Sequence, residues 1–282
     1  MRPSESPMSI QILRIAALCY AGAAAAYLVF FARPRHLKAA SAGQALLSVA
    51  FLIHAVAVGV GCGEFGGREF FSLRGGLAFI AFLAAGACLL LQRLYRIPSV
   101  GAFVTPLIVV VLLPALFGTP GHPEVVPETL RRPSLTLHIV SALGGVAVFG
   151  IASGVALMYL LQEREVKGKR FGALFSRLPS LDTLDRLTQR LVRAGFLVFS
   201  VALVTGALVA KGVWESAWDW DPQQVSSLVV WLLYGGLVQL RHTGWHGRRY
   251  AWITVAGFLL VIGSMVGLGS IPGATRHGGT YQ

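Results

Sequence analysis

The sequence carries little charge for its length. Asp, Glu, Lys and Arg together make up 13% of its 282 residues, whereas 55% are hydrophobic, and the mean hydropathy is +0.68. Soluble globular chains contain about a quarter charged residues, so this composition excludes an ordinary soluble domain. We therefore expect an integral membrane protein that contacts the lipid bilayer directly.

Cysteine is also scarce. The chain has three cysteines, Cys19, Cys62 and Cys88, and no Cys-x-x-Cys pair. This absence excludes a dithiol oxidoreductase and excludes covalent c-type haem on the chain itself. The simplest interpretation of Cys19 and Cys88 is that they are small packing residues within apolar segments.

Acidic residues are half as frequent as basic ones. The chain has twelve Asp and Glu residues and 24 Lys and Arg residues, which gives a net charge of +12. In a soluble protein this excess would favour a nucleic-acid partner, but here the positive charge follows the loops and no such partner is expected. Sixteen of the 24 basic residues lie in alternate loops, at residues 33–38, 93–96, 164–193 and 241–249. The positive-inside rule places these loops in the cytoplasm and both termini outside.

Long apolar runs are abundant. A helix needs about 20 apolar residues to cross a bilayer core of about 30 Å. Eight such runs are present, at about 9–31, 42–61, 73–94, 98–118, 134–162, 194–211, 224–241 and 249–270. The first run is too long for a secretory signal and lacks a cleavage site, so we expect a retained helix. The predicted fold class is an all-α integral membrane protein. It would be a bundle of about eight transmembrane helices, forming a single domain over 1–282 in a bacterial inner (cytoplasmic) membrane.

The inner segment 162–193 has a helical pattern outside these runs. After Ser180, a good N-cap, leucines recur at three- and four-residue spacing, at positions 181, 184, 187 and 191. This pattern predicts an amphipathic helix on the cytoplasmic membrane surface. The alternative is a solvated connector with basic residues.

The outer loop 211–224, KGVWESAWDWDPQQ, concentrates tryptophan. It holds three of the chain's six tryptophans, Trp214, Trp218 and Trp220. An interfacial aromatic belt is the structural alternative, but a belt places single tryptophans at both faces. That alternative fits the other three, Trp231, Trp245 and Trp252.

The same loop contains a helix start signal. Asp221 is a good N-cap, and Pro222 follows it at the first helical position. The next helix is therefore expected to begin here.

Histidines are few and unevenly placed. Three of the seven lie in polar loops and are most simply surface residues, namely His36, His122 and His246. His54 lies near the middle of the second apolar run, where an imidazole is costly and marks a functional site by default. The alternative is a histidine hydrogen-bonded to a neighbouring helix.

The remaining three histidines lie at helix ends. His138 and His277 fall on the expected outer side, and His242 ends the seventh run at the inner face. Two imidazoles are able to ligate a haem iron, tryptophan faces pack against a porphyrin, and basic groups meet its propionates. Haem binding is therefore the function that this combination favours.

At WESAWDWDPQQVSSLVVWLLYG the chain resembles the membrane cytochrome c assembly protein family of the CcsA and HemX type, which has a tryptophan-rich WWD motif. Further similarity lies in LTLHIVSALGGVAVFGIASGVALMYLLQ, LPSLDTLDRLTQRLVRAGF and GWHGRRYAWITVAGFLLV. The resemblance covers roughly residues 42–277.

This resemblance implies a protein that handles haem b. Haem would enter from the cytoplasmic side and be presented externally at the WWD loop, for attachment to the Cys-x-x-Cys-His motif of an apocytochrome c. The axial ligands implied are His138 and His277 outside, with His242 and its partner His54 in the membrane. The haem-packing residues implied are Trp214, Trp218, Asp219, Trp220, Asp221 and Pro222. A membrane partner with an external domain is also implied.

The sequence departs from the family pattern at two places. Gln223 and Gln224 follow Asp221-Pro222, where Lys-Glu is usual, and His277 lies in Arg-His-Gly-Gly rather than Leu-His-Ser-Tyr. These changes bear on the attachment step more than on haem binding. No catalytic residue is assigned, because thioether formation belongs largely to haem vinyl groups and substrate thiols.

Two alternatives remain at this point. In the HemX branch, the resemblance implies a membrane regulator that acts on glutamyl-tRNA reductase in haem biosynthesis. An electron-transfer cytochrome b usually needs two histidines along one helix, whereas each candidate histidine here lies on a helix of its own.

Overall fold

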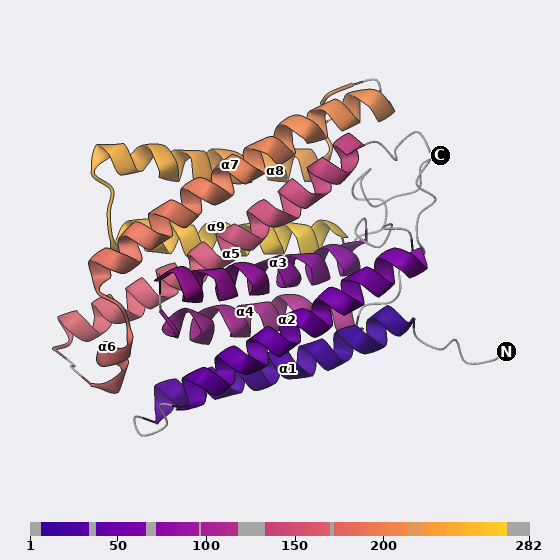
Figure 1. Ribbon diagram of the computed structural model, residues 1–282. Helices are drawn as coiled ribbons and strands as arrows, with labels where there is room; N and C mark the ends of the chain where they lie inside the picture. The colour runs from indigo at the N-terminus through magenta and orange to yellow at the C-terminus, as the bar shows by residue number, and fades with distance from the viewer. Residues whose placement is uncertain are drawn as a thin grey trace. The chain divides into compact units, whose positions relative to one another are not determined.

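The computed structural model describes residues 7–33, 38–65, 72–95, 97–117, 133–169, 172–214, 216–218 and 220–269. Within these residues every regular element is a helix (Figure 1). The chain divides into two compact units. Unit 1 comprises Met1–Pro123 and Phe171–Leu178, and unit 2 comprises Glu124–Arg170 and Pro179–Gln282. The single domain expected over 1–282 stays a prediction.

The described residues of unit 1 form four long helices and one short one. They are α1 (Met8–Ala32), α2 (Lys38–Phe65), α3 (Leu73–Tyr95), α4 (Ser99–Phe117) and α6 (Ala173–Arg177). The end of α2 caps the start of α1, because Glu64 accepts hydrogen bonds from the backbone N–H of Met8 at 3.0 Å and of Ser9 at 3.3 Å. A carboxylate at this position satisfies N–H groups that have no partner within the helix.

The core of unit 1 encloses the ring of Tyr27. This side chain is fully buried, and its hydroxyl donates to Oε1 of Gln92 at 3.0 Å. Gly43 and Gly101 make room for it, because a Cβ at either position would lie 3.0 Å or less from the Tyr27 ring. α1, α2 and α4 therefore approach closely around one aromatic side chain.

In the part of unit 2 that the structure describes there are four long helices and one 3₁₀ turn. They are α5 (Pro133–Lys167), α7 (Leu181–Trp214), α8 (Pro222–Leu240), η3 (Arg241–Thr243) and α9 (Arg248–Gly269). The Phe149 ring of α5 stacks on the Tyr234 ring of α8, with 3.6 Å between centroids. The Tyr234 hydroxyl donates to the Thr254 carbonyl of α9 at 3.2 Å, so one side chain joins three helices.

Trp231 is not an interfacial residue of the kind expected. It lies in the middle of α8, and its indole N–H donates to the Ser200 hydroxyl of α7 at 2.9 Å. Because that partner satisfies the indole, the side chain has no need to reach the membrane surface. Trp245 precedes α9, whereas Trp252 lies within α9 near its start, and both side chains are exposed.

The all-α membrane fold is confirmed in the described part of the chain. Seven of its helices are long and apolar enough to cross a membrane: α1, α2, α3, α4, α5, α7 and α9. The eighth expected span forms as α8 but is not among them. Its first turns carry Gln223, Gln224, Ser226 and Ser227, and these polar residues lower its hydropathy.

The amphipathic segment differs from its prediction. We expected a surface helix that ends before a separate span at 194–211, but α7 runs without interruption from Leu181 to Trp214. No proline falls between these residues, and helical hydrogen bonding does not depend on whether the outward side chains meet water or lipid. The Ser180 cap is confirmed, since its hydroxyl accepts from the Thr183 N–H at 3.3 Å.

Candidate functional site

His138 belongs to α5, and its side chain packs against α7. Its Nδ1 is 2.8 Å from the carbonyl oxygen of Ala202. A carbonyl only accepts hydrogen bonds, so Nδ1 carries the hydrogen and donates. In this tautomer the lone pair is on Nε2, which is the arrangement of metal-binding histidines whose other nitrogen bonds a backbone carbonyl.

Gly206 provides the space that the His138 ring occupies. A Cβ at this glycine would lie 2.7 Å from Cε1 of His138 and 2.9 Å from its Nδ1. Both atoms would be closer than carbon and nitrogen atoms pack in proteins. The lack of a side chain on α7 is therefore a condition for this placement of the imidazole.

The tryptophan-rich loop follows α7 at the same end of unit 2. Trp214 ends α7, eight residues beyond Gly206, a rise of about 12 Å. The rings of Trp218 and Trp220 meet edge to face, with 5.6 Å between centroids. Trp220 is 77% exposed and has a φ of 53°, a left-handed conformation that directs the chain sharply into the next helix.

Asp221 and Pro222 start α8 as the sequence predicted. The Asp221 carboxylate accepts from the Gln223 N–H at 2.8 Å, and Pro222 occupies the first turn. Asp221 is buried although it is acidic. Its role in the structure is to end the tryptophan-rich loop at a fixed position.

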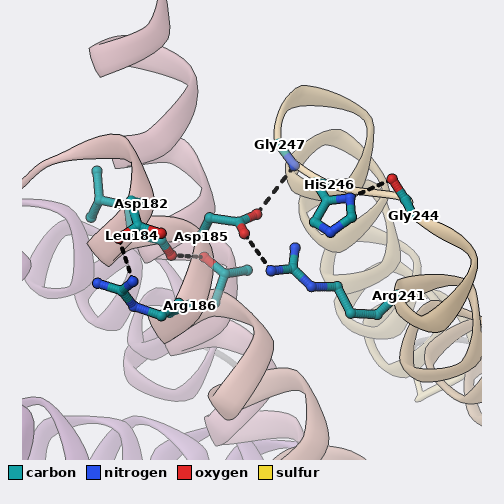
Figure 2. Close-up of polar contacts among 9 residues, drawn as sticks. Asp182, Leu184, Asp185, Arg186, Arg241, Gly244, His246 and Gly247 are labelled. Atoms are coloured by element: carbon teal, nitrogen blue, oxygen red, sulfur yellow. Dashed lines mark hydrogen bonds and ion pairs between the residues drawn. The ribbon is translucent and has the colours of Figure 1, made fainter.

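His242 lies at the opposite end of unit 2, within η3. Asp185 of α7 holds this turn from both sides (Figure 2). One carboxylate oxygen pairs with the Arg241 guanidinium at 2.6 Å, and the other accepts from the Gly247 N–H at 3.1 Å. Both side chains of the ion pair are mostly buried, with 13% of Arg241 and 15% of Asp185 exposed.

Polar residues extend this cluster along α7. With its amide oxygen toward the arginines, Gln189 accepts from Arg241 at 3.2 Å and from Arg193 at 2.7 Å. Asp185, Gln189 and Arg193 recur every four residues and so share one helix face. Sequence reasoning missed Asp185. The signal was this polar row beside the leucine stripe, which combines an acid, an amide and a base at four-residue spacing.

His54 lies in the core of unit 1. The residue is fully buried, and its Nδ1 is 3.3 Å from the Tyr20 hydroxyl of α1. The rings of Tyr20 and Phe82 meet the imidazole edge-on, with centroids 5.8 Å and 5.4 Å away. Nε2 is buried and makes no hydrogen bond within the described residues. The side chain therefore faces the protein interior and bonds to a neighbouring helix through one nitrogen only.

Some predicted site residues fall outside the part of the chain that the structure describes. His277 and Asp219 lie outside the described residues, as do the side chains of His242 and Trp214. His54 and His242 belong to different units. The pairing of His138 with His277 and of His54 with His242 therefore stays a prediction. His246 is exposed, as expected, and its Nδ1 bonds to the Gly244 carbonyl.

Comparison with known proteins gives a consistent result. The family model described as cytochrome C assembly protein matches residues 70–271. The chain is 30% identical over 222 residues to the cytochrome c biogenesis protein CcsA of Prochlorococcus marinus (strain NATL2A). The aligned region covers 68% of this chain and 70% of the relative. The chain is 29% identical over 218 residues to the protein of the same name from Parasynechococcus marenigrum (strain WH8102), and that alignment covers 68% and 71%.

Proposed function

Because the chain belongs to the cytochrome c assembly protein family, we propose that it binds haem b and presents it at the external membrane face for attachment to apocytochrome c. The protein takes part in cytochrome c biogenesis, as its relatives do by name. These relatives give no support to the regulatory alternative.

The observation that carries the proposal is the 2.8 Å contact between His138 Nδ1 and the Ala202 carbonyl oxygen. The Nδ1 hydrogen is held by this carbonyl, so Nε2 offers a lone pair to a metal. When bound, haem supplies an iron with two axial positions and vinyl groups that react with thiols. His138 would occupy one axial position, and His277 is proposed for the other.

The tryptophan-rich loop supports the same site. It lies at the end of unit 2 toward which His138 is placed, and Trp220 is largely exposed. Trp214, Trp218 and Trp220 would supply aromatic faces to a flat apolar ring. Asp221 and Pro222 would hold the loop in place through the start of α8, and Asp219 belongs to the same proposed set.

The second proposed site uses the membrane histidines. An orphaned Nε2 in a buried apolar setting costs free energy, and His54 has such a nitrogen. Coordination of a metal ion by this nitrogen would remove that cost. His242 is proposed as its partner on the route from the cytoplasm. A membrane protein with an external domain is the proposed partner in a bacterial inner membrane.

Absorption spectra of the purified protein test the external site. We expect the wild type to show a low-spin, bis-histidine spectrum when reduced. Replacing both His138 and His277 by Ala removes two strong-field ligands, so the variant should lose low-spin character or lose haem, and added imidazole should partly restore the spectrum.

The matched control is His246→Ala, since His246 is exposed and its Nδ1 bonds to the Gly244 carbonyl within its own loop. This variant should keep wild-type haem content and spectrum. If the His138→Ala, His277→Ala variant also keeps both, the external site is wrongly assigned and the regulatory alternative becomes the better one.

A further inference from the structure

Where α5 packs against α7, an aromatic or imidazole side chain of one helix repeatedly lies against a glycine of the other. A Cβ at Gly145 would lie 2.9 Å from Cβ of Phe199, and a Cβ at Gly195 would lie 2.7 Å from the ring of Phe149. The third pair is His138 with Gly206. These six residues are called the glycine seam below.

The three pairs share one antiparallel register. From pair to pair the numbers rise along α5, from 138 to 145 to 149, and fall by the same steps along α7, from 206 to 199 to 195. Steps of seven and four residues return to the same helix face. His138 therefore occupies a position where the seam otherwise places phenylalanine.

A phenylalanine would fill the third position without any polar cost. The imidazole adds a hydrogen bond that phenylalanine cannot make, from Nδ1 to the Ala202 carbonyl one turn before Gly206. The ring fits this position only because Gly206 lacks a side chain, so two features of α7 act on it together. The glycine sets where the ring lies, and the carbonyl sets which nitrogen carries the hydrogen.

We propose that Gly206 and the Ala202 carbonyl are positioning elements that hold His138 with Nε2 as its ligating nitrogen. This inference rests on the proposed function for the role of the ligand, but its claim about orientation and tautomer concerns the haem-free protein. Gly206 touches no haem in this account and acts only through His138.

The test compares two glycine substitutions in the same seam. Gly206→Ala brings a methyl group to 2.7 Å from the His138 ring, and Gly195→Ala brings one equally close to the Phe149 ring. Both variants disturb α5 against α7, but only the first disturbs the histidine. Gly206→Ala should lose the low-spin bands of the reduced protein and regain them with added imidazole, whereas Gly195→Ala should keep them.

A second measurement needs no haem. Nitrogen NMR of histidine-labelled, haem-free protein separates protonated from unprotonated ring nitrogens, and the His138 signals are identified by their loss in His138→Phe. The wild type should show an Nδ1–H, Nε2-unprotonated ring. Gly206→Ala should shift these signals, and Gly195→Ala should leave them in place.

The outcomes separate this inference from the function on which it rests. An Nε2–H tautomer at His138 overturns the inference even if Gly206→Ala fails to fold. Unchanged His138 signals and spectrum in Gly206→Ala, or equal losses in Gly195→Ala, also overturn it. A wild-type haem spectrum in His138→Phe would instead refute the ligand role, while the NMR result still decides the positioning.

Discussion

The buried His54 and the half-buried His138 differ in the group that forms a hydrogen bond with Nδ1. His138 donates to a backbone carbonyl, whose position is fixed by helix geometry and changes little with side-chain substitution. His54 depends on a single hydroxyl, that of Tyr20. The second arrangement is therefore the one that a point mutation removes most directly.

Replacing Tyr20 by Phe should destabilise the protein through His54. The change deletes the one hydrogen bond partner that the structure gives to Nδ1, and it leaves both ring nitrogens buried without a partner. The expected cost is about 1–3 kcal/mol in the free energy of unfolding. Reversible unfolding in detergent micelles would measure it.

The control is the same substitution in a His54→Phe background. There no polar group is left unsatisfied, so Tyr20→Phe should cost much less, and the difference is the coupling energy of the pair. Equal costs in the two backgrounds would show that the hydroxyl does not stabilise the imidazole.

The sequence was informative about His54 but silent about its partner. A histidine in the middle of an apolar run had to face the interior, and it is fully buried. Tyr20 lies 34 residues away on another helix, and only the packing of α1 on α2 brings the two together. For His138, the partner is a carbonyl, which every residue possesses, so no residue type could have indicated it.

At the scale of elements, α7 shows how a correct pattern led to a wrong boundary. The leucine stripe and the Ser180 cap predicted the start of a helix, and both are found. The basic residues up to Arg193 were then interpreted as a separate surface helix. Charge indicates which part of a helix meets water, but it does not indicate where the helix ends.

Asp185 makes the inner part of α7 a fixed support for η3. Replacing Asp185 by Ala removes one half of a mostly buried ion pair and the acceptor of the Gly247 N–H. Loss of a buried partner costs about 3–5 kcal/mol. We expect a large fall in thermal stability and faster modification of a cysteine placed at Thr243.

Asp182→Ala is the matched control, one turn earlier on the same helix. Its partner is Arg186, and the two side chains are 69% and 56% exposed, so the loss should be at most about 1 kcal/mol. Asp185→Asn should fall between the two, because an amide oxygen still accepts from Gly247. If Asp185→Ala is no worse than Asp182→Ala, Asp185 does not support the turn.

At the scale of the molecule, ion pairs bear on topology. Asp185 pairs with Arg241, and Glu163 lies 3.8 Å from Arg248. The end of α5, the start of α7 and residues 241–248 therefore meet at one end of unit 2. The positive-inside rule expects these residues to share a side of the membrane, which stays a prediction, and the ion pairs within unit 2 agree with it.

The identity of that side is testable. Because 16 of the 24 basic residues lie in the alternate loops, the positive-inside rule predicts external termini. A reporter that is active only in the cytoplasm should be silent when fused after Gln282 and active when fused after Lys169. Strong activity after Gln282 would reverse the orientation and with it the assignment of inner and outer sites.

Composition and apolar runs were sufficient to predict an all-α membrane protein, because transfer of residues to lipid is a sum over local sequence. The site was less accessible to prediction. Which residues meet depends on contacts between helices, such as Gly206 with His138, and a single sequence does not contain these distances.

The uninterrupted course of α7 gives the protein a molecular ruler. Asp185 forms an ion pair with Arg241 in the turn that contains His242, and Gly206 packs against the ring of His138. Asp185 and Gly206 belong to one continuous helix. At about 1.5 Å per residue, the stretch from 185 to 206 is about 30 Å long, close to the thickness of the bilayer core. A helix is stiff along its axis, so the distance between the two histidine-bearing ends of unit 2 is set by a count of residues. Inserting or deleting one turn of α7 would change that distance by about 5 Å and would break the match between the seam at one end and the ion pair at the other.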